Sequence, residues 1–189
     1  EVTLTILSNQ KTSNVTVTRG ALDTSAFYEI RKQGNVSFGY IELSTFGTDT
    51  AKQVEIALEM FKKKNIQTLV IDLRDNGGGY LTAATDILDL FFTSDEVIYQ
   101  MKEKNSAAKK YYAESDKKYE FENGYILVNE NTASASELTA GALQSEKGYQ
   151  LIGKTTYGKG SAQTQKTLSD GSVLKYTYAK WMIPNGTCI

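Results

Sequence analysis

The stretch TLVIDLRDNGGGYLTAATDILDLFF, residues 68–92, decides the fold class. Residues 68–74 form a nearly continuous apolar run, which is typical of a strand buried on both faces of a sheet. Three glycines follow the run, and apolar residues then recur at the spacing of one helix face from Leu81 to Phe91. The stretch therefore predicts a buried strand, a glycine turn and a packed helix.

The same order of elements occurs twice more. Residues 36–44 predict a strand that precedes an amphipathic helix over residues 50–64, and residues 124–130 predict a strand that precedes a helix from about Ser134 to Ser145. Strands that alternate with helices indicate an α/β fold built on parallel strands.

The remaining segments have β-type patterns. Residues 2–6 and 15–17 alternate apolar and polar side chains, and residues 161–183 contain two such runs around a Ser-Asp-Gly-Ser turn. We expect an additional β-rich part at the C-terminal end. Residues 105–120 are polar, charged and rich in tyrosine, and they predict either a solvated hairpin or a mobile lid.

Composition excludes several classes of function. The net charge of −1 over 189 residues offers no basic face for nucleic acid or an anionic membrane. The apolar runs are far shorter than the ~20 residues of a spanning helix, so we expect no membrane contact by this segment. The chain has no histidine and one cysteine, Cys188. It therefore cannot form a Ser-His-Asp or Cys-His site, a His-rich zinc site or an internal disulfide.

The stretch GKTTYGKGS, residues 153–161, partly matches a phosphate-binding loop. Gly153, Gly158 and Lys159 fit the pattern, but Gly160 stands where Ser or Thr should hold magnesium. A strand is predicted next, whereas a phosphate-binding loop opens a helix. Nucleotide binding through residues 153–161 is therefore the weakest alternative.

The segment NTASASELTAGALQ, residues 131–144, places a hydroxyl group at a strand-to-helix turn. Ser134 and Glu137 have the spacing of a capping box, which is a structural role. A hydroxyl in this position is also presented at the sheet edge beside free helix N–H groups, where it could serve chemistry. The glycines of DNGGG leave the same two interpretations open, because they permit a tight turn and also expose N–H groups.

Three motifs in register, DLRDNGGG, TASASE and TYGKGSAQ, closely resemble the carboxyl-terminal processing (tail-specific) proteases, S41-type serine peptidases with a Ser-Lys dyad. The segment GYIELSTF, residues 39–46, is also similar to the core of that family, and the resemblance runs from about residue 14 to residue 186. It implies a crotonase- or Clp-peptidase-like core of repeated strand-turn-helix units.

The resemblance also implies roles for particular residues. Ser134 matches the nucleophile, Lys159 the general base, and Gln163 the polar partner that orients the lysine. The backbone N–H groups of Ala135 and Gly78 match the oxyanion hole. No metal or organic cofactor is implied. A lysine base must be uncharged, and no Asp or Glu lies between residues 147 and 169 to hold an ammonium charged.

The expected protein is a serine endopeptidase that cleaves protein substrates near their C-termini by an acyl-enzyme mechanism. Its partners would be proteins or peptides bound through their C-terminal segment, and the resemblance places it outside the cytoplasm. A non-catalytic peptide-binding protein on the same fold is the alternative.

The resemblance also predicts how the chain is divided. Residues 1–12 are expected to be the remnant of the last strand of a PDZ domain, and residues 13–189 a catalytic core truncated at its C-terminus. The chain departs from the family pattern at Ser145, where many members carry aspartate.

Overall fold

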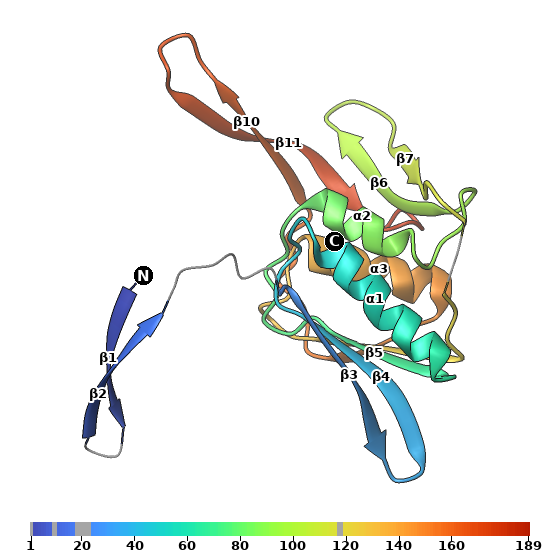
Figure 1. Cartoon of the computed structure of the whole chain (residues 1–189). Helices are drawn as coiled ribbons and strands as arrows, with labels where there is room; N and C mark the ends of the chain where they lie inside the picture. Colours follow the sequence, from blue (N-terminus) through green and yellow to red (C-terminus); the bar gives the residue numbers. More distant parts are fainter. Residues whose placement is uncertain (1, 9–10, 18–23, 117–118) are drawn as a thin grey trace.

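The computed structural model describes residues 2–8, 11–17, 24–116 and 119–189 and has a mixed α/β fold (Figure 1). Its helices are α1 (Thr50–Lys63), α2 (Leu81–Leu88) and α3 (Ala135–Lys147). Its strands are β1 (Val2–Ser8), β2 (Lys11–Val17), β3 (Ala26–Gln33), β4 (Val36–Leu43), β5 (Thr68–Asp72), β6 (Val97–Glu103), β7 (Lys109–Tyr112), β8 (Asn123–Val128), β9 (Gln150–Gly153), β10 (Ser161–Thr167) and β11 (Val173–Met182).

The central sheet has the strand order β3-β4-β5-β8-β9. Strands β4, β5, β8 and β9 run parallel, and β3 pairs antiparallel with β4 at one edge. The units β4–α1, β5–α2 and β8–α3 confirm the three predicted repeats of strand, turn and helix. Parallel neighbours need such crossovers, because a two-residue turn cannot join them.

The helices lie between the central sheet and a second sheet (Figure 1). Helix α1 buries Val54, Ala57, Leu58 and Phe61, the face that its periodicity predicts. Phe61 packs so closely on β4 that a Cβ atom at Gly39 would lie 2.5 Å from its ring. Among the described residues, no helix is long and apolar enough to cross a membrane.

Helix α2 is shorter than the apolar spacing predicts. The helix ends at Leu88, so Phe91 lies in the following turn and donates its N–H to the Leu88 carbonyl oxygen at 2.8 Å. Phe91 is nevertheless buried. Its burial produces the helical spacing in the sequence although the backbone has already left the helix.

The second sheet is antiparallel, with the order β10-β11-β6-β7. Strands β10 and β11 form the predicted hairpin, whose tip projects away from the body of the molecule (Figure 1). The segment 105–120 contributes one strand, β7, and its antiparallel partner β6 precedes the segment. The hairpin interpretation therefore holds only in part, because one of the two arms lies outside residues 105–120.

Strands β1 and β2 form a two-stranded antiparallel sheet of their own, paired from Val2↔Val17 to Ser8↔Lys11. The predicted boundary between residues 12 and 13 falls inside β2. Residues 13–17 thus pair with β1 rather than with the central sheet. The derivation of residues 1–12 from a PDZ domain stays a prediction.

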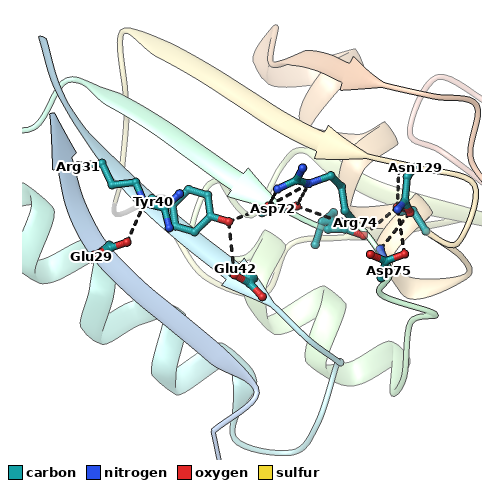
Figure 2. Close-up of polar contacts among 10 residues, drawn as sticks. Glu29, Arg31, Tyr40, Glu42, Asp72, Arg74, Asp75 and Asn129 are labelled. Atoms are coloured by element: carbon teal, nitrogen blue, oxygen red, sulfur yellow. Dashed lines mark hydrogen bonds and ion pairs between the residues drawn. The ribbon is translucent and has the colours of Figure 1, made fainter. Parts of the chain in front are cut away.

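A polar network lies on the face of the central sheet that points away from the helices (Figure 2). Asp72 is buried at the end of β5, where it accepts hydrogen bonds from the Tyr40 hydroxyl at 2.7 Å and from Arg74 Nε at 2.9 Å. The Arg31 guanidinium lies over the Tyr40 ring, 3.4 Å from its centre. Charged and aromatic groups therefore secure this face beside the glycine turn.

Burial and hydrogen bonding change the pKa values of Asp72 and Tyr40. Burial alone would raise the pKa of Asp72, but hydrogen bonds from Arg74 and Tyr40 outweigh burial and hold this pKa below its ordinary value. Burial and the hydrogen bond to Asp72 raise the pKa of Tyr40 to about 12. Asp72 is therefore ionised, and Tyr40 neutral, at physiological pH.

We predict that Tyr40→Phe lowers the free energy of unfolding by about 1.5–3 kcal/mol at pH 7, because it removes a hydrogen bond to a buried carboxylate. A carboxyl group with a lowered pKa stabilises the fold above its ordinary pKa, and this stabilisation is lost as the pH falls through the lowered value. The difference between the variant and the wild type should therefore shrink at pH 3. Urea unfolding at both pH values measures it.

Tyr125→Phe is the matched control. Tyr125 lies on the same face of the sheet and is half-buried, and its hydroxyl has no hydrogen bond to any residue that the structure describes. Equal losses of stability in the two variants would contradict the role of the Tyr40–Asp72 bond.

Candidate active site

Ser134 occupies a strained turn between β8 and α3. Its backbone has φ 58° and ψ −117°, a combination that side chains other than glycine rarely adopt and that costs on the order of 1–3 kcal/mol. The predicted capping box is present, and its Glu137 carboxylate accepts the Ser134 N–H at 2.7 Å. The Ser134 carbonyl oxygen in turn accepts the N–H of Leu138 at 3.0 Å. Helix α3 thus holds the strained residue from both sides of its backbone.

Asn76, in the glycine turn after β5, joins this turn to two other segments. Its side chain is fully buried; Nδ2 donates to the Leu43 carbonyl oxygen at 2.7 Å and Oδ1 accepts the Gly78 N–H at 2.9 Å. Its own carbonyl oxygen accepts the N–H of Ala133 and the hydroxyl of Ser136, each at 3.0 Å. One residue thereby connects the end of β4, the glycine turn and the start of α3.

A second contact joins the same two loops at the surface. The Asp75 carboxylate accepts hydrogen bonds from the side chains of Asn129 at 2.9 Å and Asn131 at 2.7 Å, and Figure 2 shows Asp75 facing Asn129. These bonds, with that of Asn131 the stronger influence, lower the pKa of Asp75. The loop before Ser134 is therefore attached to the glycine turn from two sides.

Gly78 lies directly against the serine turn. A Cβ atom at Gly78 would lie 2.9 Å from the Cβ of Ser134 and 3.0 Å from the backbone nitrogen of Ala135, and its φ is 96°. The predicted neighbours of the oxyanion hole are thus brought together.

The two predicted donors differ in their availability. Ala135 is the first residue of α3, so its N–H has no acceptor within the helix. The Gly78 N–H points instead to Asn76 Oδ1, which differs from the free donor that an oxyanion hole requires. In this conformation the Gly78 N–H is not available as a second donor, because it is hydrogen-bonded to the Asn76 side chain. The lack of a side chain at Gly78 lets the serine turn pack against it.

The segment that begins as GYIELSTF ends against the glycine turn. Phe46 donates its N–H to the Gly78 carbonyl oxygen at 3.1 Å and accepts the Tyr80 N–H at 2.8 Å. A Cβ atom at Gly79 would lie 2.3 Å from the Phe46 carbonyl oxygen, so only glycine fits this position.

Lys159 lies in the segment between β9 and β10, and its backbone is held at the start of α3. The N–H groups of Gly158 and Lys159 donate to Glu137 Oε1 at 2.6 Å and Oε2 at 2.9 Å. The Lys159 side chain is partly exposed, and its ammonium forms no ion pair within the described part of the chain. The structure thus brings the backbones of Ser134 and Lys159 to one carboxylate.

Gln163 is placed differently from the prediction. It is exposed on β10, and its side-chain nitrogen makes a long hydrogen bond of 3.4 Å to Thr177 on β11. Strand pairing directs this side chain to its neighbour on the hairpin. The role of Gln163 in orienting Lys159 stays a prediction.

A small pocket of about 30 Å³ adjoins Ser134 and is lined by Gly79, Leu81, Ala135, Leu138 and Trp181. Apart from the serine hydroxyl and the Trp181 indole N–H, the side chains that line it are apolar. Within the described ranges, no group of three or more His, Cys, Asp or Glu side chains is arranged to hold a metal ion.

The segment 153–161 lacks the geometry of a phosphate-binding loop. It leads into strand β10, as predicted, and no helix follows it. Nucleotide binding through these residues therefore has no structural support.

The sequence pattern missed two buried residues that assemble the site. In the DNGGG motif only the glycines suggest a function from sequence, and Asn76 beside them does not. Thr132 donates its hydroxyl to the Leu73 carbonyl oxygen at 2.7 Å. Thr132 also accepts the Tyr157 N–H through its carbonyl oxygen at 2.9 Å. A polar residue between a buried strand and a glycine turn is the signal that could have identified Asn76.

Comparison with known proteins gives matches over most of the chain. Residues 37–189 match peptidase family S41. The carboxy-terminal processing protease CtpB of Bacillus subtilis (strain 168) is 40% identical over 168 residues, which are 89% of this chain and 35% of that protein. CtpA of the same strain, also a carboxy-terminal processing protease, is 35% identical over 176 residues, 93% of this chain and 37% of that protein. The chain thus spans little more than a third of the length of these relatives.

The structure of the photosystem II D1 C-terminal processing protease matches with a TM-score of 0.76 and 27% identity, over 94% of this chain and 48% of that one. This match confirms the mixed α/β fold, while the finer crotonase-like description stays a prediction. Because the family match includes the glycine turn, the serine turn and the lysine segment, the chain belongs to peptidase family S41.

Proposed function

We propose that this chain is the catalytic part of a serine endopeptidase in which Ser134 is the nucleophile and Lys159 the general base. The observation that carries the proposal is the backbone of Ser134. An N-cap residue normally has an extended backbone, so a helix cap alone does not account for a φ of 58°. A strained serine at a strand-to-helix turn is typical of an exposed nucleophile.

The proposed reaction proceeds through an acyl-enzyme. Ser134 Oγ attacks the substrate carbonyl carbon while the neutral Lys159 amine accepts the hydroxyl proton. The tetrahedral intermediate collapses, the C–N bond breaks, and Lys159 returns the proton to the leaving amine. Water, deprotonated by the same amine, then attacks the ester; the bond between the acyl carbon and Ser134 Oγ breaks, Lys159 returns the proton to Oγ, and the new carboxyl terminus is released.

The negative oxygen of the intermediate needs N–H donors. The Ala135 N–H at the start of α3 supplies one of them, aided by the helix dipole. The Gly78 N–H can serve as the second donor only after it leaves Asn76 Oδ1, so substrate binding would have to reorient this peptide group. The close packing of Gly78 on the serine turn, where even a Cβ atom would lie 2.9 Å from the Ser134 Cβ, supports that assignment.

The substrate class follows from the relatives, which are named carboxy-terminal processing proteases. We extend this to the present chain as cleavage of proteins near their C-termini, with the substrate bound through its C-terminal segment. Location outside the cytoplasm is part of the same proposal. A non-catalytic peptide-binding protein is the alternative, and it leaves the strain at Ser134 without a purpose.

We predict that a fluorophosphonate probe forms one covalent adduct with the wild-type chain and none with Ser134→Ala. Lys159→Ala should react about 100- to 10,000-fold more slowly, the usual range for loss of a general base. Intact-protein mass spectrometry over time measures both effects. Equal labelling of the three proteins would count against the dyad.

We predict that Gly78→Ala lowers the labelling rate about 100-fold, because the added methyl group displaces the serine turn. The same change should lower the free energy of unfolding by about 1–3 kcal/mol, as expected for overpacking. Gly77→Ala is the matched control, since a Cβ atom there meets nothing within 4 Å. Similar behaviour of the two variants would contradict the close contact.

We predict that Ser134→Gly is more stable than Ser134→Ala by about 1–2 kcal/mol, because glycine adopts a positive φ without steric conflict. Urea unfolding of both variants gives the difference. An alanine variant as stable as the glycine variant would show that the turn is unstrained in solution.

A further inference from the structure

We propose that Glu137 is a positioning residue that fixes Lys159 beside Ser134, in addition to capping α3. The inference rests on the proposed dyad. It is carried by three hydrogen bonds that one buried carboxylate accepts from two segments of the chain.

Capping explains only one of these bonds. In a capping box the acidic side chain accepts the N–H of the N-cap residue, which here is Ser134 at 2.7 Å. The N–H groups of Gly158 and Lys159 are separated from Glu137 by 21 and 22 positions and belong to no part of the helix. Their bonds to Glu137 join a distant segment to the helix start.

One oxygen atom of Glu137 accepts two N–H groups, and this limits the distance between the backbones of Ser134 and Lys159. Oε2 accepts both the Ser134 N–H at 2.7 Å and the Lys159 N–H at 2.9 Å. The two backbone nitrogens can be no farther apart than the sum of these distances. A bond at each oxygen separately would not impose this limit.

The other attachments of the segment lie on either side of Lys159. Tyr157 donates its N–H to the Thr132 carbonyl oxygen at 2.9 Å, and Gly160 accepts the Trp181 N–H at 2.8 Å. Gly158 has φ 82°, and a Cβ atom at this position would meet nothing within 4 Å. Glu137 is therefore the group that fixes the backbone at Lys159 itself.

The chemistry of the site requires a carboxylate. Glu137 is only 5% exposed and is surrounded by N–H donors, which compensate for the burial of its charge. A glutamine has one acceptor oxygen and an NH₂ group. With its oxygen in the place of Oε2, a glutamine keeps the bonds to Ser134 and Lys159 but turns its NH₂ group toward the Gly158 N–H. In the reverse orientation it keeps only the Gly158 bond, and its NH₂ group faces two backbone N–H groups.

The hydrogen bonds from backbone N–H groups also determine which groups the negative charge of Glu137 contacts. Both carboxylate oxygens are occupied by backbone N–H groups, and the Lys159 ammonium forms no ion pair within the described residues. The carboxylate thus holds the main chain of the base without binding its side chain.

A double-mutant cycle with the fluorophosphonate probe tests the proposal. We expect Glu137→Gln to lower the maximal labelling rate about 30- to 100-fold in the wild-type background, with little change in the probe concentration for half-maximal rate. In the Lys159→Ala background the same substitution should lower the rate less than about threefold, since no lysine remains to be positioned. Glu146→Gln, an exposed change on the same helix, serves as the control.

Each outcome bears on a different claim. Equal fold-losses in the two backgrounds, or no loss in the wild-type background, would overturn the positioning role. A Lys159→Ala variant as reactive as the wild type would instead overturn the dyad.

Amide hydrogen exchange tests the hydrogen bonds from Gly158 and Lys159 to Glu137 without any measurement of catalytic activity. The N–H groups of Gly158 and Lys159 should exchange slowly in the wild type and at least tenfold faster in Glu137→Ala, which removes both acceptor oxygens, whereas the N–H groups of Tyr157 and Trp181 should remain protected as internal controls. Unchanged exchange at Gly158 and Lys159 would overturn the proposal, as would a uniform rise at all four positions.

Discussion

The hydrogen bonds of Asn76 are the constraint on which the site depends. A buried amide must satisfy its donors and its acceptor, because an unpaired polar group in the interior costs about 1–3 kcal/mol. The Asn76 side chain meets this requirement through β4 and the glycine turn. Its backbone carbonyl oxygen is paired by Ala133 and Ser136, which flank Ser134 in the serine turn. The position of Ser134 is therefore tied to the formation of the central sheet.

The layered fold could be predicted because it follows from apolar periodicity. The run at residues 68–74 and the helix face of Val54 and Phe61 need no knowledge of the tertiary structure to be recognised. The end of α2 could not be predicted in this way, because Phe91 is buried from a turn at a position that a longer helix would also bury. Apolar periodicity shows which residues are buried, and it indicates the backbone conformation only indirectly.

The site could be predicted in part. The resemblance of three sequence motifs to the carboxyl-terminal processing proteases predicted that Ser134, Gly78 and Lys159 belong to one site. The structure brings the backbones of these residues together. Local pattern assigned Glu137 to a capping box, which is correct for Ser134 and incomplete for the rest of its contacts. The donors of the additional bonds lie more than 20 positions away in sequence, so only the folded chain could reveal them. The hydrogen bond between Gly78 and Asn76 was hidden for the same reason, since it depends on a peptide orientation.

The order of the segments along the chain has a consequence for biosynthesis. Ser134 leaves the ribosome before Lys159, and Lys159 is held in place only when the segment 157–160 has settled between α3 and the β11 residue Trp181. These contacts cannot form before the chain has been synthesised as far as Trp181. In the proposed mechanism a nascent chain carries its serine without a base, so the enzyme would be unable to cleave itself or its neighbours until nearly all of this region is synthesised.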